Sequence, residues 1–196
     1  AVVLPLFLSS SLLGIVCRIL LYATLAGSLN VINGYSGQMN IGHAGFVCIG
    51  AYTGALCATK LSLAFPVQLL AGGILAAAMA WVLSKPMQRL KGIYLAIITM
   101  GFCEIMRIIC LNWTSVTGGP LGIKNIPAPL MFGIKFGSPR QYYYIFLALL
   151  AIFVFLTSRV LNSRVGRAWV SIREDDTAAK SLGVRIGHYR SINLMY

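Results

Sequence analysis

The sequence predicts an all-α protein, a polytopic bundle of transmembrane helices, on three observations. Of its 196 residues, 58% are hydrophobic and only 10% are charged, whereas a soluble domain carries about 25% charged residues. The charges are unevenly placed, since no Lys, Arg, Asp or Glu occurs between Arg18 and Lys60. Apolar runs recur at close to the length of about 20 residues that one helical crossing of a bilayer requires. We therefore expect residues 1–196 to form a single membrane domain.

The apolar runs divide the chain into candidate spans. Residues 1–8 have the character of the end of a span, because Pro5 and three serines close them. The further spans that we expect are Leu12–Asn33, Ala44–Thr59, Val67–Leu83, Ile93–Leu111 and Tyr142–Thr157. Residues 112–141 are rich in proline and glycine and are expected to be irregular and outside the membrane. Residues 191–196 resemble the start of another span, so we expect the sequence to be incomplete.

The positions of the basic residues predict the orientation of the bundle. The net charge is +12, with three basic residues in 85–91 and seven in 159–190. Two expected spans separate these segments, so both lie on the same side of the membrane, which the positive-inside rule makes the cytoplasmic side. Residues 112–141 then face outward. Because the basic residues occur where apolar runs end, the charge does not indicate a nucleic-acid partner.

The sequence contains no recognisable catalytic or metal-binding constellation. All five cysteines lie inside apolar stretches and no pair has C-x-x-C spacing, so neither a zinc site nor a disulfide framework is expected. The two histidines are far apart, and only one acidic residue lies outside a single cluster near the C-terminal end. We therefore expect no catalytic residues, no metal and no enzyme.

The uncharged segment Gly34–His43 interrupts the apolar part of the chain with glycines and polar side chains. Inside a membrane such a break is tolerated only where protein or a water-filled cavity surrounds it, and transporters place breaks where solutes pass. An ordinary turn between two helices is the alternative, and spacing alone does not decide between them. It also leaves open whether the segment lies within the membrane or at its cytoplasmic face. The candidate pathway residues are Gly34, Ser36, Gly37, Gln38, Asn40, Gly42 and His43.

Glu104 and Arg107 are the charged residues within the expected span Ile93–Leu111. Residues three apart share a helix face and can pair. A lone charge at the bilayer centre costs about 2.5–3.5 kcal/mol on insertion scales, so this face is expected to meet protein or a cavity. Glu104 is therefore a further candidate pathway residue. The alternatives are a purely structural ion pair, or an Arg107 side chain that reaches toward the outer membrane interface.

The polar segment 159–190 contains a short acidic run followed by two alanines. Acidic residues suit a helix N-terminus and Gly183 suits a helix end, so we expect a short cytoplasmic helix. Such a helix is a natural docking element for a soluble partner, although a solvated connector would have the same composition. The candidate docking residues are Arg173, Glu174, Asp175, Asp176, Thr177, Ala178, Ala179 and Gly183.

Four blocks of the sequence carry a resemblance: Gly34–Phe46 with Ile49–Thr53, Leu90–Phe102 with Glu104, Ile105 and Arg107, Asn112–Pro120, and Ile172–Gly183. In this order they closely resemble the permeases of branched-chain amino acid ABC importers. The last resembles the EAA loop, with which such permeases dock on their ATPase subunits. In the general pattern Glu-Ala-Ala stands four residues before a glycine, and here Thr177 replaces the glutamate.

The resemblance implies a truncated permease domain whose segment 159–190 is the cytoplasmic coupling loop. The implied protein is a multi-pass subunit of a bacterial inner-membrane importer that works by alternating access. Its expected partners are a second permease subunit in a heterodimer, two cytoplasmic ATPase subunits that bind the ATP, a periplasmic solute-binding protein and the lipid bilayer. The chain itself then needs no cofactor.

Branched-chain or other hydrophobic amino acids are the solutes that the resemblance favours. Urea or short-chain amides are the alternative within the same class. An ATP-independent channel or secondary transporter is the alternative from another class, but it would need no docking helix. A non-transporting membrane scaffold would leave the break at Gly34–His43 unexplained.

Overall fold

The computed structural model describes residues 5, 9–88, 90, 92–131 and 134–196, and the expected span end at 1–8 lies almost wholly outside these residues. The described residues form helices, irregular connections and one pair of two-residue strands, β1 (Leu130–Met131) and β2 (Ile134–Lys135). The predicted all-α class is therefore confirmed. The helices are α2 (Ser10–Asn30), α3 (His43–Lys60), α4 (Phe65–Met87), α5 (Ile93–Asn112), α6 (Thr114–Thr117), α7 (Pro139–Leu161), α8 (Arg164–Glu174), α9 (Asp176–Ser181) and α10 (Ile186–Met195).

Four helices among the described residues are long and apolar enough to cross a membrane. They are Ser10–Tyr35, which joins α2 to a π-helical turn, and α4, α5 and α7. The expected span Ala44–Thr59 is present as α3 but falls outside this group, because its 18 residues include a histidine, a lysine and three glycines. The outer helix faces carry many exposed large apolar side chains, as lipid contact requires. The chain is an integral membrane protein.

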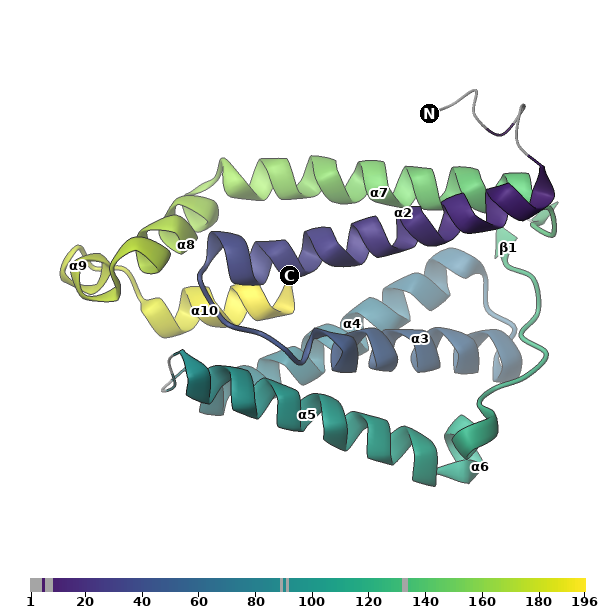
Figure 1. Ribbon diagram of the computed structural model, residues 1–196, viewed down its shortest axis with the longest axis horizontal. Helices are drawn as coiled ribbons and strands as arrows, with labels where there is room; N and C mark the ends of the chain where they lie inside the picture. Colours follow the sequence, from purple (N-terminus) through teal and green to yellow (C-terminus); the bar gives the residue numbers. More distant parts are fainter. Residues whose placement is uncertain (1–4, 6–8, 89, 91, 132–133) are drawn as a thin grey trace.

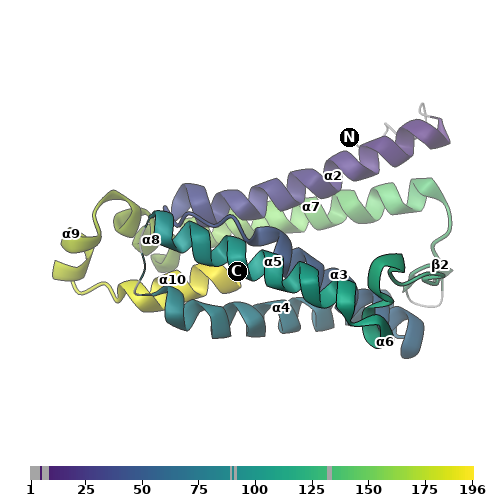
Figure 2. The same cartoon turned by 60° about the horizontal axis from the view of Figure 1, so that its bottom comes forward.

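The helices pack in two groups that α10 joins. In Figure 1, α2 lies along α7, and α3 lies between α4 and α5. A small core of Leu13, Cys17 and Tyr143 holds α2 against α7. A second core combines Ile32, Leu95 and Leu194 with two residues of α4, so it unites the end of the first span with α4, α5 and α10. Figure 2 shows α10 beside α4, on the side where α2 and α7 lie.

The two ends of the bundle differ in character. The end of α4, the start of α5, α8 and α9 lie at one end, whereas α6 and the β1–β2 pair lie at the other (Figure 1). The described residues of both basic segments therefore lie at the same end, as the orientation prediction requires. Residues 112–141, predicted to be irregular, contain α6, a 3-10 turn at Gly119–Leu121 and the strand pair, with irregular chain between them.

Several helix boundaries differ from those expected from the sequence. Helix α7 begins at Pro139, three residues before the expected span, because Ser138 and Gln141 form a capping box there, a pattern that satisfies the first free backbone N–H groups of a helix. It ends at Leu161 and so includes the start of the expected coupling loop. Helix α10 spans 186–195. Residues 191–196 therefore belong to a helix that starts inside the polar segment.

Candidate functional site

The break between α2 and α3 is shorter than the sequence suggests. The helix continues as a π-helical turn over Val31–Tyr35, so Gly34 is helical, and irregular chain runs only from Ser36 to Gly42. The Asn33 side chain accepts a hydrogen bond from the Asn40 backbone N–H at 3.0 Å and donates one to the Asn40 carbonyl at 3.5 Å. Gly37 has a φ of +65°, a conformation that glycine adopts without strain. Side chains thus replace the helical bonds that the break gives up.

The break extends from the end of the bundle toward its interior. The Thr99 hydroxyl on α5 accepts a hydrogen bond from the Ile41 backbone N–H at 3.1 Å, and a methyl group on Gly42 would overlap the Thr99 carbonyl oxygen. Because α5 begins at Ile93 and a helix rises 1.5 Å per residue, Thr99 lies about 9 Å along α5. Figure 1 shows the chain running from the end of α2 to the start of α3 in this way. The segment therefore begins at one face and ends within the span.

Two polar atoms at the start of α3 are buried without a partner among the described residues. They are Nδ2 of Asn40 and Nδ1 of His43. The other ring nitrogen of His43 shares a 2.8 Å hydrogen bond with the Ser28 hydroxyl on α2, and the Asn40 side-chain oxygen accepts from the Gly42 backbone N–H at 2.9 Å. Buried polar groups in proteins nearly always have partners. This point of the break can therefore still hydrogen-bond water or a solute.

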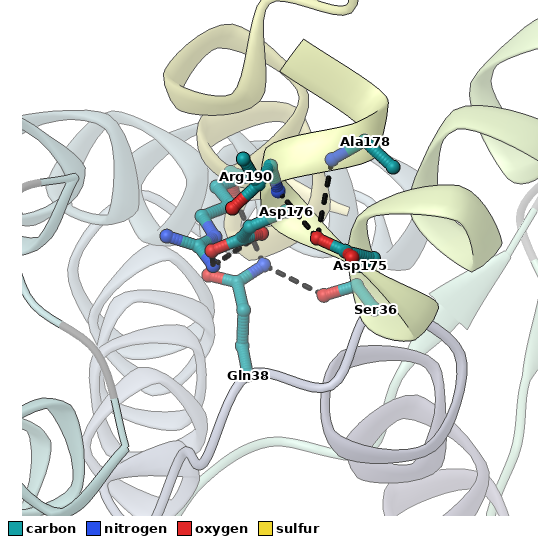
Figure 3. Close-up of polar contacts among 7 residues, drawn as sticks. Ser36, Gln38, Asp175, Asp176, Ala178 and Arg190 are labelled. Carbon is teal, nitrogen blue, oxygen red and sulfur yellow. Dashed lines mark hydrogen bonds and ion pairs between the residues drawn. The ribbon is translucent and has the colours of Figure 1, made fainter. Parts of the chain in front are cut away.

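The predicted short helix in the acidic segment is α9. Asp175 is its N-cap, and its carboxylate accepts hydrogen bonds from the backbone N–H groups of Thr177 and Ala178 at 2.7 and 3.1 Å (Figure 3). Gly183, with a φ of +83°, follows its last turn. Glu174 is the last residue of α8 rather than part of α9.

The candidate docking residues around α9 differ in their exposure to solvent. Thr177 and Ala178 are exposed, as are Arg173, Glu174, Asp175 and Gly183, whereas Asp176 is half-buried. Ala179 is 2% exposed, so its side chain packs inward and cannot meet a partner. Of the two alanines, only Ala178 offers a surface.

The structure brings the break and the C-terminal helices into direct contact. Asn193 on α10 is fully buried, and its side-chain oxygen accepts hydrogen bonds from the Ser36 hydroxyl and the Gln38 amide, each at 3.2 Å. Its amide donates to the Val31 carbonyl at 3.3 Å. The Gln38 amide also donates to Ser36 at 2.7 Å and to the Arg190 backbone carbonyl at 3.5 Å. Figure 3 shows Gln38 between Ser36 and Arg190.

A second contact runs from the end of α8. The Arg173 guanidinium donates to the Gly34 carbonyl at 3.0 Å and pairs with Glu174. A side chain at Gly37 would collide with the Arg173 side chain, so the absence of a Cβ there lets the two segments approach. The candidate pathway and docking residues are thus adjacent, although the Arg173 and Gly34 pair is 139 positions apart in the sequence.

Helices α8, α9 and α10 are themselves tied together. Arg190 on α10 contacts both carboxylate oxygens of Asp176 on α9, at 3.0 and 2.8 Å, with side chains only 14% and 15% exposed. The Trp169 ring on α8 is fully buried and donates to the Tyr189 carbonyl at 2.9 Å. These contacts hold the three helices as one unit.

Sequence reasoning missed α10 and its polar residues. Arg190 counted only as a positive charge, and Asn193 lay in an apolar stretch that resembled a new span. A buried asparagine within an apolar helix needs hydrogen-bond partners, and that was the available signal. Thr99 was missed because a hydroxyl within a span is unremarkable in sequence.

Glu104 is the candidate pathway residue that the structure does not join to the break. It forms the predicted ion pair with Arg107, which donates from Nε at 2.9 Å. Within the described part of the chain this is its only hydrogen-bonding partner, and the two side chains are 53% and 60% exposed. The ion pair is therefore exposed among the described residues, and only protein outside them could cover it. Likewise, no group of three possible metal ligands is found among the residues that the structure describes.

Comparisons with known proteins agree with this architecture. The family model described as "Branched-chain amino acid transport system / permease component" matches residues 11–196. The chain is 38% identical, over 94% of its length, to the "High-affinity branched-chain amino acid transport system permease protein LivM" of Escherichia coli strain K12 and to the protein of the same name from Salmonella typhimurium strain LT2.

The match covers 49% of each relative, so the chain spans about half the length of the curated relatives that it matches. No solved structure matches significantly. These homologues are transport permease components rather than enzymes. Because the family model covers nearly the whole sequence, the chain belongs to the family of permease components of branched-chain amino acid transport systems.

Proposed function

We propose that the chain belongs to a permease subunit of an ATP-driven importer of branched-chain and other hydrophobic amino acids in a bacterial inner membrane. The observation that carries this proposal is that α10 contacts the break at Ser36–Gly42 and α8 contacts the π-helical turn just before it. Asn193 and Arg173 connect the C-terminal helices, which include the docking element, to the region of the polar break. Such a connection suits a transporter in which movement of a cytoplasmic ATPase changes the structure of the permease within the membrane. A channel would need no such connection.

The mechanism that we infer is alternating access. The exposed face of α9, around Ala178, docks on a cytoplasmic ATPase subunit. Closure of the ATPase pair on ATP shifts α9, and the Asp176–Arg190 ion pair carries the shift to α10. Asn193 and Arg173 then displace the break. Because the break extends about 9 Å along α5, its movement changes the access of solute from either side.

The partners follow from this assignment. The ATP is bound by two cytoplasmic ATPase subunits, so this chain carries no cofactor of its own. A second permease subunit completes the pathway, and a periplasmic binding protein delivers the solute. The exposed Glu104–Arg107 pair, mid-way along α5, supports a permease partner because a charged pair is costly against lipid.

The solute is inferred from the two relatives, whose names specify branched-chain amino acids. Asn40 and His43 offer the unpaired polar atoms of the break, and such atoms suit the ammonium or carboxylate group of an amino acid. They would equally suit the amide groups of urea, so urea remains the solute to test against leucine.

The test is uptake by the full-length permease, reconstituted in proteoliposomes with its permease, ATPase and binding-protein partners. We expect labelled leucine to accumulate only with ATP and binding protein present, and ATP without Mg²⁺ serves as the control. Uptake of urea alone would contradict the proposed solute but would agree with the proposed mechanism. Uptake of either solute without ATP would contradict the proposed mechanism.

A further inference from the structure

Two of the free thiols face each other across the interface between α3 and α5. The Sγ atoms of Cys48 on α3 and Cys110 on α5 lie 3.2 Å apart, within reach of a weak S–H···S hydrogen bond, although the residues are 62 positions apart in the sequence. Cys48 is half-buried and Cys110 is 9% exposed. Because a disulfide bond is about 2.05 Å long, the two sulfurs need to approach by only about 1.2 Å to be joined.

A close approach of the two helices brings these thiols together. Helices α3 and α5 lie side by side (Figure 1). A methyl group on Gly45, three residues before Cys48, would collide with the Phe102 ring on α5. The rings of Phe46 and Phe102 pack with their centroids 4.9 Å apart, a distance typical of a favourable aromatic pair. The thiol contact is therefore part of a well-packed interface.

The thiol pair lies toward the outward end of the bundle. Helix α5 begins at Ile93, so at a rise of 1.5 Å per residue Cys110 lies about 25 Å along it. The Cys110 carbonyl accepts a hydrogen bond from the Thr117 hydroxyl on α6 at 2.7 Å, and α6 lies at the end opposite α8 and α9 (Figure 1). In the expected orientation this end faces the periplasm, which is an oxidising compartment.

The other cysteines do not share this arrangement. Cys17 packs in the apolar core between α2 and α7, the usual role of a buried thiol. Cys57 follows Cys48 by nine residues, or about 2.5 turns, so it points to the opposite face of α3. Cys103 on α5 also lies near this interface, beside Gly45. Among the described residues, however, only Cys110 is within hydrogen-bond distance of the Cys48 sulfur.

We propose that Cys48 and Cys110 form a redox modification site, a dithiol that hydrogen peroxide converts into a disulfide between α3 and α5. Peroxide is small and uncharged, so it reaches a half-buried thiol that a protein oxidant cannot. The Cys48 thiol takes one oxygen from peroxide as the O–O bond breaks, which gives a sulfenic acid and one water. The Cys110 sulfur then attacks the Cys48 sulfur, the S–S bond forms and a second water leaves. Two electrons pass from the thiols to peroxide, and both thiol hydrogens end in water.

The disulfide fixes the position of α3 relative to α5. In the proposed function, on which this consequence rests, the break moves while the Thr99 hydroxyl holds its far end against α5. A single contact of this kind allows α3 to turn about it. Cys48 lies six residues beyond Gly42, about 9 Å further along α3, so a covalent bond there is a second attachment that prevents the turn. The modification therefore adds an oxidised, inactive state to the transport cycle.

The first test detects the disulfide in the full-length permease pair. The protein is treated with hydrogen peroxide, its remaining thiols are blocked, and its peptides are analysed by mass spectrometry with and without dithiothreitol. We expect a Cys48–Cys110 peptide pair that dithiothreitol separates. It should be absent from Cys48→Ser and Cys110→Ser and present in Cys57→Ser, the matched control on the opposite face of α3. The absence of a cross-link in the unaltered protein, or a bond from Cys48 to Cys103, would overturn the proposal.

The second test measures uptake by the same four proteins, whose folding is checked by size-exclusion profiles. Peroxide is removed with catalase before the ATPase subunits are added, so that only the permease is oxidised. We expect the oxidised unaltered protein and Cys57→Ser to lose leucine uptake and to regain it with dithiothreitol, whereas Cys48→Ser and Cys110→Ser keep it. Equal loss in all four proteins, or full uptake by protein that contains the disulfide, would contradict the proposed inactive state.

The failure of the redox site and the failure of the proposed function give different results, because the cross-link is detected without transport. If the reduced permease imports leucine with ATP but forms no Cys48–Cys110 bond, only the redox site is wrong. If the reduced permease imports no leucine, the proposed function is wrong, and the peptide analysis still decides whether the two thiols are joined.

Discussion

Asn193→Ala is the substitution that most directly tests whether α10 transmits movement to the break. The change removes hydrogen bonds to Ser36, Gln38 and Val31, at 3.2, 3.2 and 3.3 Å. Each such bond contributes about 0.5–1.5 kcal/mol net. Ser36 and Gln38 keep partners in the Ile32 carbonyl and in each other, so the loss falls in the lower half of that range. We expect the free energy of unfolding to fall by about 2–3 kcal/mol, including the small cavity left behind.

Ser191→Ala is the matched control for this substitution. Ser191 lies on the same helix, is also buried, and accepts a hydrogen bond at 2.8 Å from Gln88, the residue that follows α4. It stabilises the packing of α10 without contacting the break. Unfolding measurements on the full-length protein in mixed micelles should therefore show a lower free energy of unfolding for both variants.

The functional readout separates the two variants. In proteoliposomes we expect Asn193→Ala to hydrolyse ATP but to import at least about fivefold less leucine per ATP, the lower limit of a coupling free energy of 1–3 kcal/mol. Ser191→Ala should keep the unaltered ratio. If the two variants lost the same fraction of uptake per ATP, α10 would be only a structural support, and our mechanism would be refuted.

Three further substitutions test other parts of the structure. Gly42→Ala should lower the yield of folded protein, because its methyl group would overlap a carbonyl on α5, whereas Gly101→Ala, whose methyl group meets open space, should not; size-exclusion chromatography measures both. Ala178→Trp should abolish binding of the ATPase subunits while the protein still inserts, whereas Ala179→Trp should prevent folding because that site is buried; pull-down and membrane yield distinguish them. Glu104→Gln should reduce assembly with the second permease subunit or uptake, and unaltered co-purification and uptake would show that the pair is peripheral.

The spans and the acidic helix were predictable because each follows from local physics. A run of apolar residues closed by charges or prolines defines a crossing, and α4, α5 and α7 each contain the run expected. The capping of α9 by Asp175 follows from the affinity of an N-terminus for a carboxylate. The pairing of Glu104 with Arg107 follows from their spacing on one helix face.

The path of the break and the role of α10 were not predictable in this way. Whether Ser36–Gly42 turns at the surface or enters the bundle depends on Thr99, 58 positions from Ile41 in the sequence. Asn193 acquires its role only through partners 155 to 162 positions away. Nothing in the local pattern around either residue encodes such distant contacts.

The distribution of these bonds also explains why movement at α9 would reach the membrane interior rather than stop at the surface. Between Ser36 and Gly42 the backbone has no helical ladder, and its polar groups depend on side chains of neighbouring elements. Asn193 on α10 binds the Ser36 and Gln38 side chains, Arg173 on α8 binds the Gly34 carbonyl just before the segment, and Thr99 binds its far end to α5. If α8 to α10 shift as a unit, the bonds to Asn193 and Arg173 must either break inside a buried site or carry the break with them. Leaving several buried polar groups unpaired costs more than bending an irregular segment, so in the proposed mechanism the break would follow α10 and pivot about Thr99.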